Sequence, residues 1–219
     1  MFAQFDFEVI LRSLPFLWQG MQVSLLLTGL AVLGGIVLGT ILALFRLSPL
    51  LPLAWFGGLY VNMFRSVPLI LVIFWFYFLV PVALGRPVGG FTSALIAFVL
   101  FEAAYYCEII RAGIQSVPKA QTNAGLAVGL SQAQVMRHVV LPQAFRNMLP
   151  VLLTQGIILF QDTSLVYVVA LRDFMTASTV VATRDGRLIE MYTFAALVYF
   201  AICFAASRAV RRLRRTYAL

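Results

Sequence analysis

The dominant pattern along the chain is a series of long, continuous apolar runs separated by short polar segments. A membrane-spanning helix needs about 20 apolar residues, and each run has about this length. Transmembrane strands would instead show segments of about 10 residues that alternate between apolar and polar. The pattern therefore predicts an all-α, polytopic membrane protein with five transmembrane helices. The runs cover residues 21–45, 58–81, 91–111, 148–170 and 191–207.

Composition supports this fold class. Of the 219 residues, 62% are hydrophobic and 11% are charged, and the mean hydropathy is +0.97. Soluble domains are about 45–50% apolar and about 25% charged, so this chain has more apolar surface than one soluble core can bury. Cys107 and Cys203 lie inside apolar runs, and His138 is the single histidine. These counts argue against a disulfide scaffold, a metal site or a haem between two histidines, and we expect no cofactor in this chain.

The distribution of basic residues predicts how the spans are oriented, because Lys and Arg collect in short cytoplasmic segments. One set of segments contains ten of them: Arg46, Arg111, Lys119, Arg137, Arg146, Arg208, Arg211, Arg212, Arg214 and Arg215. The other set contains Arg12, Arg86, Arg172, Arg184 and Arg187, among Asp6, Glu8, Asp173, Asp185 and Glu190. The C-terminus is therefore predicted to be cytoplasmic and the N-terminus outside. The net charge of +8 favours anchoring near anionic lipid over nucleic-acid binding.

Several polar residues fall inside the predicted spans, where a charged side chain costs at least about 2.5–3.5 kcal/mol. In the second span Arg65 precedes Pro68, which interrupts the backbone hydrogen bonding and is tolerated only against protein or a wet cavity. Glu102 lies near the middle of the third span, and the fourth contains Gln161, Asp162, Thr163 and Ser164 in succession. Together these residues predict a translocation path. The alternative is that Arg65 pairs with Glu102 or Asp162 only to hold helices together.

Two shorter patterns predict contacts of helices. Gly35 and Gly39 have the G-x-x-x-G spacing that lets helix backbones approach closely in lipid. We expect them to pack within this chain, with packing against a second subunit as the alternative. Glu108 and Arg111 are three residues apart near the end of the third span, which predicts an ion pair along that helix.

The segment between the third and fourth spans, residues 114–147, predicts two short helices on the cytoplasmic side. Pro118 can open the first helix, and Gly129 is placed to end it in a left-handed conformation. Ser131 and Gln134 form a capping-box pattern that begins the second helix, which we expect to end at Leu141-Pro142. One face of this second helix is apolar: Val135, Met136, Val139 and Val140. We expect the pair to be buried against another surface, and a helix resting in the lipid interface is the alternative.

Within this segment, Ala124, Gly129 and Leu141-Pro142 resemble the Ala-Ala, Gly and Leu-Pro of the EAA loop of permease subunits in binding-protein-dependent ABC importers. Permeases for polar amino acids, most of all those for glutamate and aspartate, are similar in four stretches: VNMFRSVPLILVIFWFYFLVP, FEAAYYCEIIRAGIQS, LPQAFRNMLP and LLTQGIILFQDTSLVYV. The resemblance extends over nearly the whole chain. It departs from the motif at Asn123, where a glutamate is usual, and at Gly125, which replaces the second alanine. Any salt bridge of that glutamate is absent here.

The resemblance implies a type I ABC importer permease fold in the bacterial inner membrane. Such a subunit pairs with a second permease, which is a homologous chain or a copy of itself, over two ATP-binding subunits. A solute-binding protein delivers the amino acid substrate from outside. ATP and magnesium would belong to the ATP-binding subunit, because this chain has no G-x-x-x-x-G-K-[ST] loop and is not expected to be an enzyme. Coupling to the ATPase is implied for Gln121, Asn123, Ala124, Gly129, Ser131, Leu141 and Pro142.

Two other functions are weighed against the importer. A stand-alone channel or secondary transporter for a small polar solute often has internal repeats, and the five spans show no convincing repeat. An intramembrane serine protease would need a histidine within the bilayer, whereas His138 lies in the loop. The sequence therefore favours a permease subunit, with the channel or secondary transporter as the alternative.

Overall fold

All regular structure in the described part of the chain is helical. The computed structural model describes residues 5–86 and 88–217, and no strand occurs within them. The elements are, in chain order, α1 (Phe7–Leu47), α2 (Leu51–Arg65), α3 (Leu69–Phe74), η2 (Trp75–Leu79), α4 (Val80–Leu84), α5 (Gly90–Gln115), α6 (Lys119–Ala127), α7 (Gln132–Val135), η3 (Met136–Val140), α8 (Leu141–Asp162), η4 (Thr163–Val169), α9 (Phe174–Arg184) and α10 (Leu188–Tyr217). The predicted all-α fold is confirmed.

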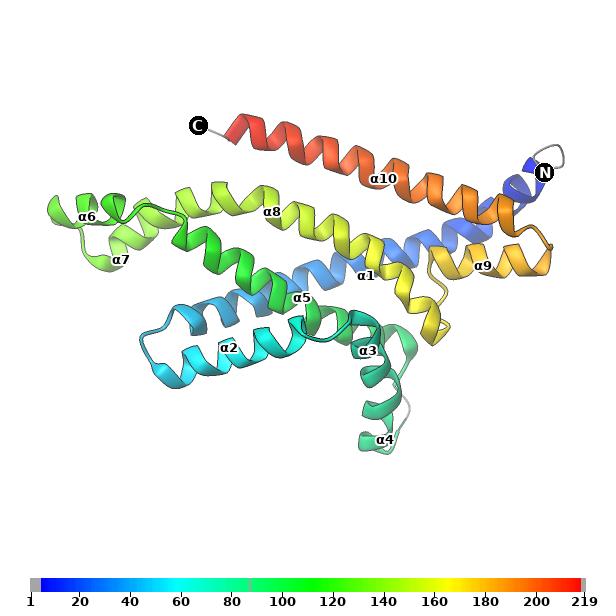
Figure 1. The fold of residues 1–219 in the computed structure, drawn as a ribbon, viewed down its shortest axis with the longest axis horizontal. Coiled ribbons are helices and arrows are strands. Elements are labelled where there is room, and N and C mark those ends of the chain that lie inside the picture. Colours follow the sequence, from blue (N-terminus) through cyan, green and yellow to red (C-terminus); the bar gives the residue numbers. More distant parts are fainter. Residues whose placement is uncertain (1–4, 87, 218–219) are drawn as a thin grey trace.

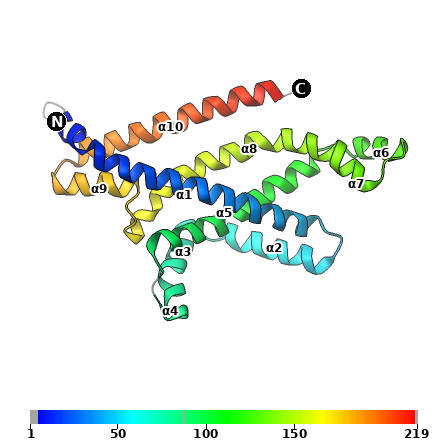
Figure 2. The same ribbon diagram turned by 180° about the vertical axis from the view of Figure 1, so that it is seen from behind.

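Within the described residues, four helical stretches are long and apolar enough to cross a membrane: Phe7–Leu47, Gly90–Gln115, Gln132–Val169 and Leu188–Arg214. Figures 1 and 2 show the start of α1 beside α9 and the start of α10, whereas the end of α10 lies far from α9. The first stretch begins at Phe7, well before the predicted residue 21. Its cap explains the early start, because the carboxylate of Asp6 accepts a hydrogen bond from the Glu8 N–H at 2.9 Å.

The second predicted span, residues 58–81, is broken at Pro68, where the sequence predicts an interruption, but it is bent much more sharply than a single transmembrane helix. α2 ends at Arg65, α3 begins at Leu69, and the chain bends by 101° between them. Pro68 explains the break, because it has no N–H to donate and disfavours helical backbone at the residue before it. The two arms count as a fifth span only if they are taken together.

Two π-helical turns, η2 and η3, each end two residues before a proline, at Pro81 and Pro142 respectively. A proline within an α-helix removes one hydrogen bond and its ring collides with the carbonyl four positions earlier. A local π turn adjusts the backbone around that position. The second loop helix therefore does not end at Leu141-Pro142, as the sequence predicts. Instead α7, η3 and α8 form one continuous helix that extends into the fourth span.

The centre of the fold is the crossing of α1 and α5, where two glycines of α1 lie directly against α5. A Cβ added to Gly39 would be 2.8 Å from Tyr106 Cβ and 2.9 Å from the Ala103 carbonyl oxygen. A Cβ added to Gly35 would be 3.0 Å from Tyr106 Cδ2. Carbon atoms in ordinary contact are about 3.5–4.0 Å apart. The G-x-x-x-G spacing thus packs within this chain, as predicted.

α9 is a helix between the fourth and fifth spans that the apolar pattern does not predict, because its 11 residues form no long apolar run. Asp173 caps it and accepts hydrogen bonds from the N–H groups of Met175 and Thr176 at 3.0 and 2.9 Å. The hydroxyl of Ser24 on α1 accepts a bond from the Phe174 N–H at 3.1 Å. The cap and this bond fix the start of α9 against α1.

Candidate translocation path and coupling surface

Glu102, on α5, is completely buried at the centre of the helices. Both oxygens of its carboxyl group accept hydrogen bonds from Gln155 Nε2 on α8, at 3.1 and 3.3 Å. These bonds reduce the cost of burying a polar group among apolar helices. Tyr106, one turn further along α5, is also fully buried. Sequence reasoning missed Gln155, whose only signal is an isolated amide within the apolar run of the fourth span.

Arg65 lies at the C-terminal end of α2, immediately before the 101° bend. Its guanidinium group is over the ring of Tyr105, 5.4 Å from the centroid. It also lines a cavity of about 390 Å³ together with Glu108 of α5 and Asn147 of α8. Within the described residues Arg65 forms no ion pair, so the alternative that it pairs with Glu102 or Asp162 is wrong.

The reason for this difference is the position of Arg65 relative to α5. α2 stops at the bend, and the guanidinium group reaches Tyr105, about one turn along α5 from Glu102. Both oxygens of the Glu102 carboxyl group already accept hydrogen bonds from Gln155. A guanidinium group over an aromatic ring gains a cation–π interaction and needs no carboxylate partner.

The polar residues 161–164 lie where α8 changes into the tighter helix η4. Thr163 is fully buried, and its hydroxyl donates to the Phe160 carbonyl at 2.7 Å. Asp162 and Ser164 are half-buried, while Gln161 is exposed. The four side chains thus differ in burial, from the fully buried Thr163 to the exposed Gln161.

The bend at Pro68 and the tighter helix η4 lie together, because η4 packs against α3, the arm that follows the bend. Val166 and Val169 of η4 share an apolar cluster with Leu69 and Ile73 of α3. Non-helical backbone at membrane depth is tolerated where protein buries it or where it lines a wet cavity. Broken helices of this kind occur at the substrate sites of transporters.

Glu108 links the C-terminal ends of α1 and α5. It forms ion pairs with Arg46 of α1 and with Arg111 of its own helix, the latter at 2.7 Å. The predicted Glu108–Arg111 pair is therefore confirmed. Arg111 also donates to the side chain of Gln115 at 2.6 Å.

The loop after α5 contains the helix caps that the sequence predicts. α6 begins after Pro118 and ends at Ala127, and Gly129, two residues later, has φ +89°. The N–H groups of Leu130 and Gly129 donate to the carbonyls of Gly125 and Leu126, at 3.2 and 3.0 Å, which is a Schellman motif. Both bonds of the capping box between Ser131 and Gln134 are present.

The helix pair is packed on its inner side and open on its outer side. A Cβ added to Gly125 would be 2.9 Å from Val135 Cγ2, so the missing alanine methyl lets α6 approach α7. An apolar cluster secures the inner side: Val117, Val135, Val140 and Ala144. The residues implied in ATPase coupling are all exposed: Gln121, Asn123, Ala124, Gly129, Ser131, Leu141 and Pro142. Val128, 78% exposed, adds an apolar side chain to this exposed surface.

An ion-pair cluster lies at the opposite end of the molecule, beside the N-terminus. Asp185, in the turn between α9 and α10, pairs with Arg12 of α1 at 3.1 Å and with Arg184 at 2.9 Å. The Arg184 hydrogen bond, supported by Arg12, lowers the pKa of Asp185 to about 2. Arg187 pairs with Glu190 at 3.1 Å. This end of the chain therefore presents acidic and basic side chains that largely neutralise one another.

Comparison with known proteins gives matches over almost the whole chain. Residues 35–218 match the family described as binding-protein-dependent transport system inner membrane component. The chain is 50% identical over 219 residues to the glutamate/aspartate import permease protein GltK of Escherichia coli O6:H1, covering 97% of this chain and 98% of that protein. It is 32% identical over 197 residues to the arginine transport system permease protein ArtQ of Bacillus subtilis, covering 90% of each. A solved chain of an amino acid ABC transporter is 29% identical, with a TM-score of 0.91, and the match covers 96% of this chain and 98% of that one.

Proposed function

Because the chain belongs to the family of binding-protein-dependent transport system inner membrane components, we propose that it is the permease subunit of an ATP-driven importer for glutamate and aspartate. The observation that carries the proposal is the 50% identity, over 97% of this chain, to a permease named for import of those two amino acids. A stand-alone channel or secondary transporter has no comparable support, because the family is one of transport systems that depend on a binding protein.

The proposed substrate path follows the polar groups of the broken helices. Asp162 and Ser164 are half-buried beside the α8–η4 transition and can solvate the ammonium group of a passing amino acid. Arg65 is exposed and forms no ion pair within the described chain, so its guanidinium group can meet a substrate carboxylate. Gln161 precedes these residues and Thr163 lies between them, and Glu102 anchors α8 in the core through its hydrogen bond from Gln155.

The proposed ATPase contact is the outer side of α6 and α7. Its helix pair is rigid, because a Schellman motif and a capping box fix the turn at Gly129. It is continuous with α8 through η3, so a push on α7 is transmitted along the helix that carries Asp162. This continuity favours a mechanical role of the α6–α7 pair over the alternative that the pair rests in the lipid interface.

The mechanism would then be alternating access. ATP and magnesium bind to partner subunits, whose closure brings the loop of this chain toward that of a second permease and opens the path outward. A solute-binding protein releases the amino acid into this path, and ATP hydrolysis then returns the transporter to the inward-facing state. We place the α6–α7 loop and the C-terminus in the cytoplasm and the N-terminus outside, because the loop end is rich in unpaired arginines.

The test is transport by the complete assembly in proteoliposomes, with ATP inside and loaded binding protein outside. We expect ATP-dependent uptake of labelled L-glutamate that excess unlabelled L-aspartate suppresses, whereas L-arginine does not. Liposomes without the ATP-binding subunit are the control. Uptake that continues without ATP would support a channel or secondary transporter, and competition by arginine alone would overturn the proposed substrate class.

A further inference from the structure

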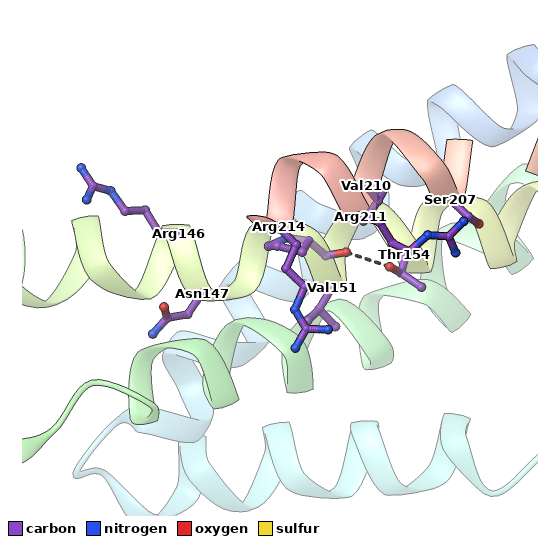
Figure 3. Close-up of a pocket in the computed structure, with 9 residues that line it drawn as sticks. Arg146, Asn147, Val151, Thr154, Ser207, Val210, Arg211 and Arg214 are labelled. Atoms are coloured by element: carbon purple, nitrogen blue, oxygen red, sulfur yellow. Dashed lines mark hydrogen bonds between the residues drawn. The ribbon is translucent and has the colours of Figure 1, made fainter. Parts of the chain in front are cut away.

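A basic cavity lies between α8 and α10, apart from the proposed path. Its volume is about 590 Å³, and it is lined by Arg146 of α8 and by Arg211 and Arg214 of α10. Figure 3 shows Arg211 and Arg214 between the two helices, with Arg146 at the other end of the cavity. All charged side chains among its described lining residues are arginines.

These arginines have no partner within the described chain, where they form neither an ion pair nor a side-chain hydrogen bond. Two other polar side chains of the cavity already have bonds. Thr154 donates to the Pro150 carbonyl at 2.8 Å (Figure 3), and Asn147 donates to the hydroxyl of Ser116 at 2.9 Å. The cavity therefore presents excess positive charge and guanidinium donors to any ligand that enters it.

An apolar groove of about 500 Å³ adjoins this cavity and shares Val210 with it. Its walls come from α1, α8 and α10, and they include Phe160, Ile202 and Leu213. Thr28, a hydroxyl residue of the groove, uses its donor on the Ser24 carbonyl at 2.7 Å. The groove therefore suits a hydrocarbon chain.

The length of the two cavities matches one leaflet of a bilayer. From Cys203, in the groove, to Arg214, in the basic cavity, α10 rises by about 17 Å at about 1.5 Å per residue. The hydrocarbon core of a membrane is about 30 Å thick. The arginines thus lie about half a bilayer away from the deep end of the groove.

We propose that the two cavities together bind one anionic glycerophospholipid, with its phosphate at Arg211 and Arg214 and an acyl chain in the groove. Guanidinium groups form strong, paired hydrogen bonds with phosphate oxygens, and basic pockets between membrane helices suit anionic headgroups. A soluble phosphate would leave the adjoining apolar groove without a ligand, so the combination points to a lipid.

The first test measures binding of radiolabelled phosphatidylglycerol to the purified, delipidated chain in detergent micelles. We expect saturable binding, and about 30-fold weaker binding for Arg211→Gln/Arg214→Gln, since each arginine contributes to the affinity for anionic lipid. The double variant Arg137→Gln/Arg208→Gln removes the same charge outside both cavities and is expected to bind like the wild type. Unchanged elution from a sizing column shows that each variant is folded.

The second test narrows the groove instead of changing charge. Ala209→Phe, at an exposed position lining the groove, is expected to weaken lipid binding at least fivefold, whereas Ala205→Phe, exposed on α10 outside it, is not. The proposal is overturned if the arginine and groove variants bind like the wild type, or if glycerol phosphate competes as strongly as the lipid. It is also overturned if the assembled transporter excludes the lipid and a partner subunit cross-links to position 211.

Discussion

Glu102 and Arg65 are an acidic and a basic residue among apolar helices that do not pair with each other. Glu102 is bonded to Gln155 in the core, whereas Arg65 lies over the ring of Tyr105 at the end of α2. A cation–π contact uses the face of the ring and leaves the guanidinium N–H groups available. The arrangement therefore keeps a positive donor group ready for a carboxylate that comes from outside the chain.

Replacing Arg65 tests this role. We expect Arg65→Ala to lower the initial rate of labelled glutamate uptake at least tenfold, because the path loses its carboxylate partner. Arg65→Lys keeps the charge but not the planar donor group, so an intermediate rate is expected. Arg86→Ala, which removes an exposed arginine beyond α4, serves as the control. Wild-type uptake by an assembled Arg65→Ala complex would remove Arg65 from the path.

At the scale of single residues, the sequence shows which polar side chains lie within apolar runs but not which of them contact one another. An arginine and two carboxyl groups inside apolar runs suggest ion pairs, yet the partner of Arg65 depends on the direction of the bend after α2. That direction results from packing against α5 and η4, which no local pattern encodes. Gln155 is missed for the same reason, since only the fold brings it to Glu102.

Among the helices, glycine and proline positions determine crossings, caps and bends. Local chemistry is enough to predict the caps at Gly129 and Ser131 and the close packing of the G-x-x-x-G pair, because each depends on neighbouring residues. The π turns, the size of the bend at Pro68 and the existence of α9 depend on contacts between distant segments. An apolar run also looks the same whether its helix is straight or broken.

Two glycines of α1 provide a matched pair for testing the crossing with α5. Gly39→Ala would bring a methyl group to 2.9 Å from the backbone oxygen of Ala103, so we expect a loss of stability of about 1–3 kcal/mol. Gly29→Ala meets nothing within 4 Å, and alanine is the better helix former, so no loss is expected. Thermal unfolding of the purified chain in detergent distinguishes the two, and equal midpoints would contradict this packing.

Gly129 tests the coupling surface. Gly129→Arg adds a bulky side chain on the exposed side of the loop and costs about 1–2 kcal/mol at its positive φ. We expect a membrane-inserted chain that binds its ATPase poorly and shows no stimulation of ATP hydrolysis by loaded binding protein. Gly186→Arg has the same backbone strain and open surroundings at the other end of the molecule, and it should retain stimulation. Normal stimulation in Gly129→Arg would contradict docking at this surface.

The two ends of the molecule differ in how many of their arginines pair with acidic side chains. At the N-terminal end, Asp185 and Glu190 pair with arginines. At the opposite end, Glu108 pairs with Arg46 and Arg111, and several arginines have no acidic partner among the described residues: Arg137, Arg146, Arg208, Arg211 and Arg214. The side chain of Arg215, in the same predicted set, lies outside the described residues. This excess of arginines without an acidic partner strengthens the inference that this end of the molecule faces the cytoplasm.

The central claim is that the polar segment after α8 lines the substrate path, and Ser164 allows the most direct measurement. The natural cysteines, Cys107 and Cys203, are buried, so a Ser164→Cys thiol can be followed against a low background. During ATP-driven turnover we expect a water-soluble maleimide to label it, and saturating L-glutamate to slow the labelling at least threefold. Thr183→Cys, exposed near the end of α9 outside the membrane-spanning stretches, should be labelled without such protection. Labelling of Ser164→Cys that glutamate leaves unchanged, in a complex with normal uptake, would contradict the claim.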